Sequence, residues 1–168
     1  MIRNALPTDA EAVAALHHRA RSTYYPDGLP DDGIDWPGRW REVIARPDTV
    51  VLCAVPEAGQ APAQDGPEVA GIASFRTAEG AGEETVKLYQ FHVEPARWRA
   101  GIGTALHAAC VAGWQRQGRR FAVLDVHVDN ARARAFYAHH GWTPDPAFPP
   151  AEGDHHLALR LEVPLLGG

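Results

Sequence analysis

Residues 97–114, RWRAGIGTALHAACVAGW, decide the fold that the sequence predicts. Gly101 and Gly103 stand directly before an apolar repeat with helical spacing, and the strand-like run YQFHV (89–93) precedes them. A strand that passes through a glycine turn into a helix leaves the N–H groups of the first helical turn unpaired, and these groups favour an anion. The stretch therefore predicts an α/β fold with an anion site at the start of this helix, flanked by two arginines.

Outward from this stretch, the pattern of apolar residues predicts the other elements. The predicted strands are residues 2–5, 49–55, 69–77, 85–93, 120–128 and 155–163. The predicted helices are residues 7–25, 35–46, the segment from the glycine turn to about Gln117, and 130–141. Thr8 is the expected N-cap of the first helix, with Glu11 completing a capping box. The proline- and glycine-rich segment 56–68 reads as a long hairpin loop.

This order predicts one α/β domain over residues 1–168, built around a mixed, largely antiparallel central sheet flanked by helices. We expect strands 85–93 and 120–128 to be parallel, because a helix connects them.

Composition is that of an ordinary globular domain, with 168 residues, 45% apolar and 22% charged. The net charge of −5 and the absence of a basic stripe argue against nucleic acid as a partner. We see no signal peptide and no apolar run that would span a membrane, so we expect a cytoplasmic protein. Cys53 and Cys110 are interpreted as small buried apolar residues.

The glycine turn alone does not identify a ligand. It lacks the third glycine of a dinucleotide-binding fingerprint and the Lys-Ser/Thr of a P-loop, and a tight turn with no ligand explains it equally well. A second motif lies in NARARAFYAHHGW (130–142), where Asn130 caps a helix that carries Phe136 and Tyr137. In isolation this tyrosine reads as a core residue.

Together, the segments VEP (93–95), WRAGIG (98–103) and NARARAFYAHHGW resemble the GNAT superfamily of acetyl-CoA-dependent N-acetyltransferases. That family carries Val-x-Pro, then Arg/Gln-x-x-Gly-x-Gly/Ala at a helix start, and later Asn-x-x-Ala-x-x-Phe-Tyr-x-x-x-Gly-Phe. The resemblance extends over nearly the whole chain. It implies a sheet whose fourth and fifth strands splay apart, with acetyl-CoA as the cosubstrate and no metal.

The resemblance also implies the residues that bind the cosubstrate. The diphosphate would lie on the turn, and the pantetheine arm would pair with the backbone of the fourth strand and reach the second motif. These cofactor-binding residues are Phe91, Val93, Trp98, Arg99, Ala100, Gly101, Ile102, Gly103, Thr104, Asn130, Ala133 and Phe136. Trp98 stands where the family usually has Arg or Gln, and Arg97 or Arg99 would supply that charge.

The implied reaction is direct attack of an amine on the acetyl thioester, with Tyr137 protonating the departing thiolate. Many members carry a glutamate as general base at the position of Lys87 in this chain. Glu83 and Glu84 lie just upstream and would act through water. Of these, Glu84 is the base that we expect, although a turn carboxylate with no catalytic role explains it as well. His92 has a suitable intrinsic pKa, but its place in the strand puts it on the sheet face opposite Val93.

The resemblance places the acceptor pocket at the first two helices, the loop between them and the region of the sixth and seventh strands. The expected substrate-binding residues are Tyr24, Tyr25, Trp36 and Trp40, although core packing explains the tryptophans about as well. Asp27, Asp31 and Asp32 would attract an amine cation, although turn preference also explains them. The histidine pairs 17/18, 139/140 and 155/156 are interpreted as surface residues and not as metal ligands, because adjacent side chains diverge.

Two functions follow from the resemblance. The first is transfer of an acetyl group to a primary amine of a small molecule or peptide, by an enzyme that forms a homodimer or acts alone. The alternative is a non-catalytic acyl-CoA-binding or sensor domain with the same fold, which Lys87 and Trp98 favour slightly. Retention of Tyr137 favours the enzyme, because binding alone does not need this phenol.

Overall fold

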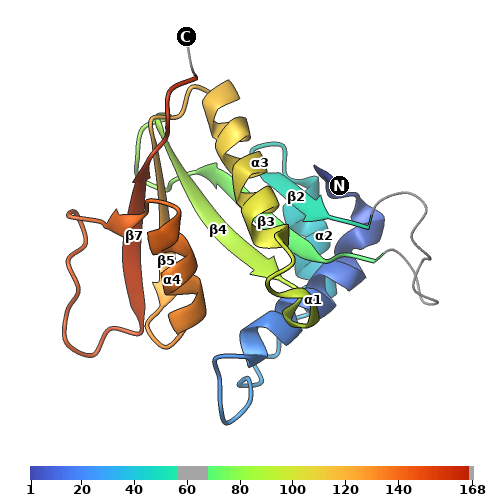
Figure 1. The fold of residues 1–168 in the computed structure, drawn as a ribbon. Helices are drawn as coiled ribbons and strands as arrows, with labels where there is room; N and C mark the ends of the chain where they lie inside the picture. The colour runs from blue at the N-terminus through green and yellow to red at the C-terminus, as the bar shows by residue number, and fades with distance from the viewer. Residues whose placement is uncertain (57–67, 167–168) are drawn as a thin grey trace. The chain divides into compact units, whose positions relative to one another are not determined.

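The computed structural model describes residues 1–56 and 68–166. Its strands are β1 (Ile2–Asn4), β2 (Val50–Ala54), β3 (Gly71–Thr77), β4 (Thr85–Val93), β5 (Phe121–His127), β6 (Thr143–Pro144) and β7 (His156–Glu162). Its α-helices are α1 (Ala10–Ser22), α2 (Trp36–Ala45), α3 (Ile102–Arg116) and α4 (Ala131–His139). Short 3₁₀ turns, η1 (Pro7–Asp9) and η2 (Pro95–Arg97), precede α1 and α3 (Figure 1).

The strands form one mixed sheet in the order β1-β2-β3-β4-β5-β7-β6. β1 with β2, β2 with β3, β5 with β7, and β6 with β7 pair antiparallel, whereas β4 and β5 pair parallel. The predicted α/β class and the parallel crossover are therefore confirmed. The ladder between β4 and β5 runs from Thr85–Phe121 to Lys87–Val123 and does not extend to Leu88 and Tyr89.

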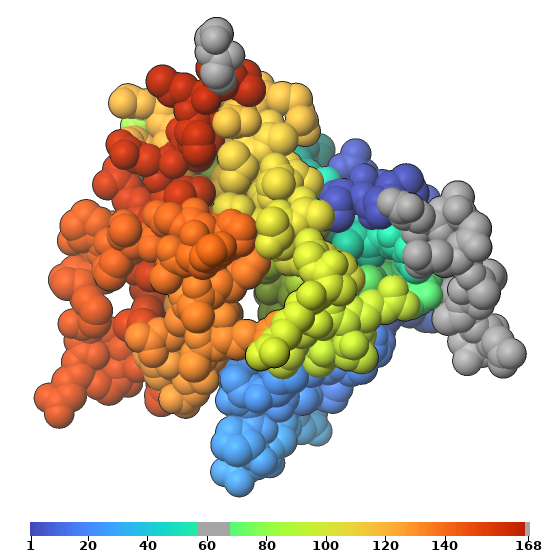
Figure 2. Space-filling view, in the orientation of Figure 1, coloured from blue at the N-terminus to red at the C-terminus, as the bar shows by residue number. Residues whose placement is uncertain are grey.

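The chain divides into two compact units. Unit 1 comprises Met1–Phe75 and Gln90–Cys110, and unit 2 comprises Arg76–Tyr89 and Val111–Gly168. In unit 1, α1 and α2 pack together over β2 and β3, and their shared core includes Val13, Leu16, Trp40, Cys53 and Ile72. The loop between α1 and α2 (light blue) projects from this unit in Figure 2.

The start of α3 packs on the other face of the strands in unit 1. Ile72 of β3 belongs to the core under α1 and α2, so the preceding residue, Gly71, points to the opposite face. A Cβ atom at Gly71 would lie 3.2 Å from Cγ2 of Ile102 and 3.4 Å from Cδ2 of Leu106, both in α3. The glycine therefore permits a close approach of this helix to β3.

Unit 2 has a core of its own. Alternate residues of β5, Ala122, Leu124 and Val126, are buried, and so are Leu159 and Leu161 of β7, with which β5 pairs. Trp114 and Trp142 are buried with their ring centroids 6.2 Å apart, in an edge-to-face arrangement that aromatic pairs prefer. This core supports α4 and its motif.

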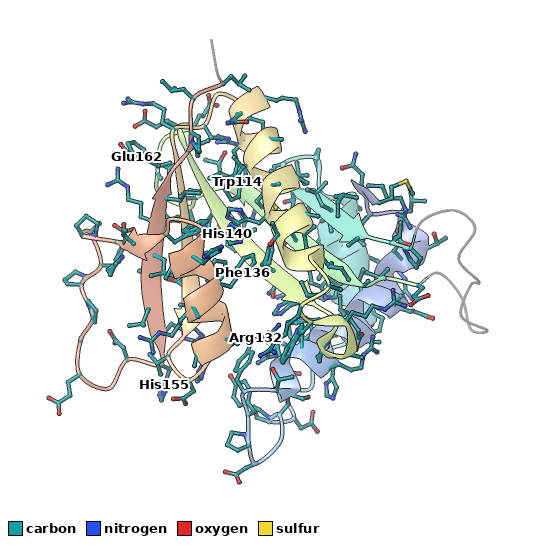
Figure 3. The ribbon with its side chains drawn as sticks, in the orientation of Figure 1. Trp114, Arg132, Phe136, His140, His155 and Glu162 are labelled. Atoms are coloured by element: carbon teal, nitrogen blue, oxygen red, sulfur yellow. The ribbon has the colours of Figure 1, made fainter. Side chains whose placement is uncertain are left out.

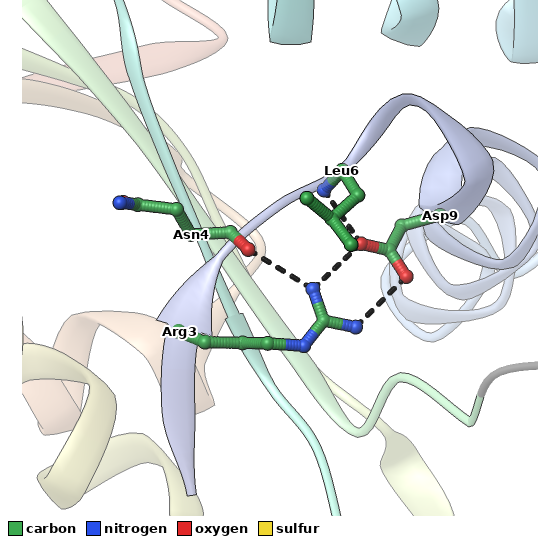
Figure 4. A network of polar contacts seen from close by, with 4 residues as sticks. All are labelled: Arg3, Asn4, Leu6 and Asp9. Carbon is green, nitrogen blue, oxygen red and sulfur yellow. Dashed lines mark hydrogen bonds and ion pairs between the residues drawn. The ribbon is translucent and has the colours of Figure 1, made fainter.

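The first helix begins differently from the prediction. Thr8 is not its N-cap, because the polar contacts are made by Asp9, which is only 1% exposed. Its carboxylate accepts hydrogen bonds from the backbone N–H of Leu6 at 2.7 Å and from both terminal nitrogens of Arg3 at 2.7 and 3.0 Å (Figure 4). These charge-assisted bonds lower the pKa of Asp9, with the Arg3 hydrogen bond the largest cause.

Most of the predicted helices and strands are present in the structure. The observed α-helices and six of the strands overlap predicted segments, whereas the two-residue strand β6 and both 3₁₀ turns were not predicted.

The two cysteines are buried, as their sequence context predicts. Cys53 and Cys110 are free and buried, and burial raises the pKa of each thiol to about 12. Residues 57–67 of the predicted hairpin loop lie outside the described residues. Among the helices of the described chain, none has the length and apolar character needed to cross a bilayer.

Candidate functional site

The turn between η2 and α3 presents a row of backbone donors. Arg99 and Gly101 have φ angles of +68° and +82°, so the chain here alternates into the left-handed region. The first bond of the helix is donated by the N–H of Ala105 to the carbonyl of Gly101 at 3.0 Å. Within the part of the chain that the structure describes, the N–H groups of residues 99–104 have no acceptor. Such a concave row of N–H groups at a helix N-terminus is suited to an anion.

Trp98 and the arginines beside it have separate roles at this turn. The indole Nε1–H of Trp98 donates to the carbonyl of Val93 at 3.1 Å, which ties the turn to the end of β4. Arg97 forms an ion pair with Glu68. Arg99 is exposed and forms no ion pair with a described residue. Of the two arginines expected to supply charge, Arg99 is therefore the one that is available to an anion.

The end of β4 faces two helices of unit 1. The ring of Phe91 lies 6.4 Å from the ring of His107 in α3. The neighbouring residue, His92, lies with its ring 4.8 Å from that of His17 in α1, and its Nε2 is 2.8 Å from Oε1 of Gln90. His92 is thus on the α1 side of the strand, and Phe91 is on the α3 side.

The second motif forms α4 of unit 2, as its sequence predicts. The side-chain oxygen of Asn130 accepts a hydrogen bond from the N–H of Ala133 at 3.1 Å, so Asn130 is the N-cap. Tyr137 is 6% exposed, and its ring packs against those of Phe136 and Trp142. Arg132, Phe136 and His140 lie along one side of the helix (Figure 3). The rings of Phe136 and His140 are 4.4 Å apart.

Glu84 and Lys87 each form an ion pair within unit 2. Glu84 is exposed immediately before β4, and its Oε2 lies 3.5 Å from Arg120 at the start of β5. The Nζ of Lys87 lies 2.9 Å from Oδ2 of Asp125. Lys87 is therefore a cation held by a carboxylate.

A cavity of about 660 Å³ lies within unit 1, between α1 and the loop that leads into α2. Of the four predicted substrate-binding residues, Trp36 lines this cavity. Trp40 is 2% exposed and belongs to the core. Tyr24 and Tyr25 are half-buried in the segment that follows α1, with their rings 5.2 Å apart. The structure thus brings Trp36 to the cavity, while Tyr24, Tyr25 and Trp40 are not among its lining residues.

The prediction that the paired histidines are surface residues was wrong for His17, which is 3% exposed. It lines the cavity, and its Nδ1 accepts a hydrogen bond from the indole N–H of Trp40 at 3.3 Å. Burial lowers the pKa of His17 to about 4, and burial together with the neighbouring His17 lowers the pKa of His92 to about 3. A signal existed in the sequence, because His17 continues the apolar stripe of Val13 and Leu16 at helical spacing.

Comparison of structures shows the same fold in known acetyltransferases. An N-acetyltransferase of Thermoplasma acidophilum (PaiA), solved with coenzyme A, has a TM-score of 0.75 at 16% identity, over 96% of this chain and 98% of that one. A putative GNAT acetyltransferase of Desulfovibrio desulfuricans has 0.72 at 24% identity, over 98% and 99%. The ribosomal-protein-S18-alanine N-acetyltransferase of Escherichia coli has 0.69 at 17% identity, over 99% and 96%. At these identities the likeness establishes the fold.

Comparison of sequences is more specific. No curated protein sequence matches the chain. The model of the acetyltransferase (GNAT) family matches residues 12–142, which include the VEP segment, the glycine turn and the second motif up to Trp142. This match covers well over half of the chain. The chain therefore belongs to the acetyltransferase (GNAT) family.

Proposed function

We propose that this protein is an N-acetyltransferase that moves an acetyl group from acetyl-CoA to a primary amine of a small molecule or peptide. The observation that carries the proposal is the row of N–H groups of residues 99–104, which have no acceptor among the described residues. Membership in the acetyltransferase family supports acetyl transfer in general. A structural neighbour solved with coenzyme A supports acyl-CoA as the donor.

In this proposal the diphosphate of the cosubstrate binds the turn of Arg99, Ala100, Gly101, Ile102, Gly103 and Thr104. Fixed N–H donors and the positive end of the α3 dipole favour its negative charge without needing a charged side chain at position 98. The guanidinium of Arg99, exposed and without an ion pair among the described residues, adds charge. Trp98 contributes by holding the turn to Val93.

We propose that the pantetheine arm pairs with the backbone of Phe91 and Val93, as an added strand would. Asn130, Ala133 and Phe136 are the proposed contacts of the second motif with this arm. Asn130 uses its side-chain oxygen to cap α4, so its amide NH₂ group is the part that would donate to the arm. All of these assignments follow the family motif onto matching residues of this chain.

The proposed chemistry is direct transfer. The neutral amine nitrogen attacks the carbonyl carbon of the acetyl thioester, and the carbon–sulfur bond then breaks. Tyr137 gives its hydroxyl proton to the departing thiolate sulfur, and the extra proton of the amine passes through water to Glu84. The half-exposed side chain of Glu84 is accessible to the water that this route needs.

A second function is favoured by one observation, the ion pair of Lys87 with Asp125 at 2.9 Å, at the position where many members carry a glutamate base. A domain that lacks this carboxylate could still bind acyl-CoA. If it does not transfer the acyl group, it would act as a sensor. Both functions need the turn, and only the enzyme needs the phenol of Tyr137.

Calorimetric titration with CoA and acetyl-CoA tests the binding part of the proposal. We expect both ligands to bind, and we expect Gly101→Ala to weaken both, because a φ of +82° is strained for any residue with a Cβ. Gly82→Ala, in a turn where an added Cβ would meet no atom within 4 Å, is the matched control. Absence of binding to the native protein would overturn the proposal.

We also propose that residues 1–168 form one domain. The boundaries between the two units fall inside β3, β4 and α3, where the backbone continues through regular structure. Domain boundaries normally fall in exposed linkers. A single cooperative unfolding transition by circular dichroism and by tryptophan fluorescence would support this, and separate transitions would contradict it.

A further inference from the structure

The cavity of unit 1 combines a buried polar side chain with an acidic rim. Its volume is about 660 Å³, and α1, the following loop and the start of α2 line it. The lining residues that the inference uses are Glu11, His17, Arg21, Asp32, Ile34 and Trp36. These include an apolar wall, a buried imidazole and charged groups of both signs.

His17 is held in one tautomer. Because the indole N–H of Trp40 donates to Nδ1 of His17 at 3.3 Å, the proton of the neutral imidazole is on Nε2. Burial keeps this ring neutral by lowering its pKa to about 4. The Nε2–H group has no acceptor among the residues that the structure describes, although the side chain is only 3% exposed. His17 therefore offers a neutral donor to a ligand in the cavity.

The charged side chains that line the cavity indicate which charge a ligand would carry. Asp31, Asp32, Asp35 and Glu11 contribute carboxylates, and Arg21 contributes a cation. Asp32 is fixed by bonds from the N–H of Ile34 at 3.0 Å and the indole of Trp36 at 3.1 Å, and the Ile34 bond is the largest cause of its lowered pKa. Glu11 is paired with Arg41 at 3.4 Å. The three aspartates still outnumber the guanidinium of Arg21, so the cavity favours a cationic ligand and disfavours one with its own carboxylate.

The cavity is joined to the strand that leads into the glycine turn. The ring of His17 packs on His92 near the end of β4. Two residues further along α1, Arg19 donates to Oε2 of Glu94, which directly follows β4, at 2.9 and 2.5 Å. α1 therefore carries one wall of the cavity and is fixed to the segment that enters η2 and the turn.

We propose that this cavity binds the acceptor of the acetyl transfer, and that the acceptor is an α-amino amide, with His17 donating Nε2–H to its carbonyl oxygen. The inference rests on the proposed function. An α-amino amide, such as the amino terminus of a peptide, has no carboxylate beside its amine and a neutral carbonyl oxygen next to it. Its amine binds as the cation and gives one proton to water before the neutral nitrogen attacks. The ring of Trp36 and the side chain of Ile34 contact its apolar side chain.

Binding of a matched ligand series tests this inference without any acetyl transfer. The probes are leucinamide, leucine and 3-methylbutylamine, which share the apolar chain and amine and differ in carrying a carboxamide, a carboxylate or hydrogen. We expect leucinamide to bind the native protein about tenfold more tightly than either of the others, with or without CoA, since one hydrogen bond made to a buried donor is worth about that factor. Equal affinities, tighter binding of leucine, or no binding of leucinamide would overturn the inference.

Variants and a spectroscopic readout identify the donor. His17→Gln should reduce the preference for leucinamide to within about twofold, whereas His139→Gln, an exposed histidine of α4, should leave it unchanged. With nitrogen-15-labelled histidine, the native His17 ring should show an unprotonated Nδ1 and an Nε2–H signal that shifts on leucinamide binding. A proton on Nδ1 would contradict the inference, and this spectrum decides the matter even if His17→Gln does not fold.

The two proposals fail in different ways. If leucinamide binds with the predicted preference and is not acetylated, the preference of the cavity for an α-amino amide and the role of His17 hold, and the enzyme assignment fails. If amines are acetylated without preference for leucinamide over 3-methylbutylamine, the enzyme assignment holds and the role of His17 fails.

Discussion

At the scale of single residues, Tyr137 shows how one side chain supports two interpretations. Its ring is buried between Phe136 and Trp142, as a core tyrosine would be. The family motif makes it the proposed acid. Removing the hydroxyl and leaving the ring separates the two, because packing depends on the ring and the chemistry depends on the proton.

We predict that Tyr137→Phe lowers kcat by about 10²–10⁴-fold, which is the usual contribution of acid–base assistance. The Kd for acetyl-CoA should stay within about twofold, because the proposed contacts of the diphosphate are on the turn. Steady-state kinetics and calorimetry on the same preparation provide both values. An unchanged kcat would remove Tyr137 from the mechanism.

Arg99 offers a prediction in which stability and affinity change in opposite directions. Its φ of +68° costs an L-residue roughly 1–2 kcal/mol, a cost that glycine does not have. Arg99→Gly should therefore keep or raise Tm, while the loss of a charge-assisted contact weakens CoA binding about tenfold. Arg99→Lys, which retains a cation, is the control. If Arg99→Gly binds CoA as tightly as the native protein, the arginine does not contact the ligand.

At the scale of elements, the connection from β1 to α1 depends on the buried Asp9. Removing one partner of a buried ion pair typically costs about 3–5 kcal/mol, and the 29% exposure of the Arg3 side chain places this pair near the lower value. We predict that Asp9→Asn lowers the free energy of unfolding by about 3 kcal/mol, measured by urea denaturation. Asp48→Asn, which breaks the exposed pair with Arg46, should cost about 1 kcal/mol or less. Equal losses in the two variants would contradict the role of burial.

The approach of α3 to β3 gives a second prediction at this scale. A side chain at Gly71 would press on Cγ2 of Ile102, the first residue of α3, and on Cβ of Ala54 at 3.3 Å. Overpacking of this kind typically costs about 1–3 kcal/mol, so Gly71→Val should lower Tm and also weaken CoA binding by moving the start of α3. Gly82→Val, with open space around it, should change neither. Normal CoA affinity in a destabilised Gly71→Val protein would show that the turn is independent of this contact.

At the scale of the whole molecule, the buried His17 and the half-buried His92 set the response to acid. The pKa values of His17 and His92 are lowered to about 4 and about 3, so folding keeps both rings neutral while the unfolded chain protonates them near pH 6.5. The free energy of unfolding is therefore highest above about pH 6.5, and it decreases progressively as the pH falls from there toward 4. Asp9, whose pKa is lowered, adds a further loss only below about pH 3.9.

Urea unfolding at pH 7.5, 6.0 and 5.0 measures this response. We predict a decrease in stability on the order of 4 kcal/mol between pH 7.5 and 5.0, about 2 kcal/mol for each ring, and about half of that decrease in a folded His17→Gln variant. A profile that is flat to pH 4.5 in the native protein would contradict the burial of His17.

Much of this architecture could be predicted from the sequence because its signals are local. Apolar periodicity identified the helices and the longer strands, and the glycines identified the turn before α3. Interactions between distant residues had no such signal. Nothing near Trp98 shows that its indole donates to Val93, and only packing of α2 on α1 brings Trp40 to His17. Thr8 was expected as a cap because its spacing to Glu11 is right, but Thr8 lies inside the 3₁₀ turn η1, and the contact of Asp9 with the distant Arg3 has no local signal.

Steady-state release of the CoA thiol from acetyl-CoA, with leucinamide and a panel of other primary amines, is the most direct test of acetyl transfer by this protein. We predict thiol release that continues over many turnovers, requires an amine, and produces one acetylated amine for each thiol. If acetyl-CoA binds the protein but no amine in the panel sustains thiol release, the enzyme assignment is contradicted and the sensor function takes its place.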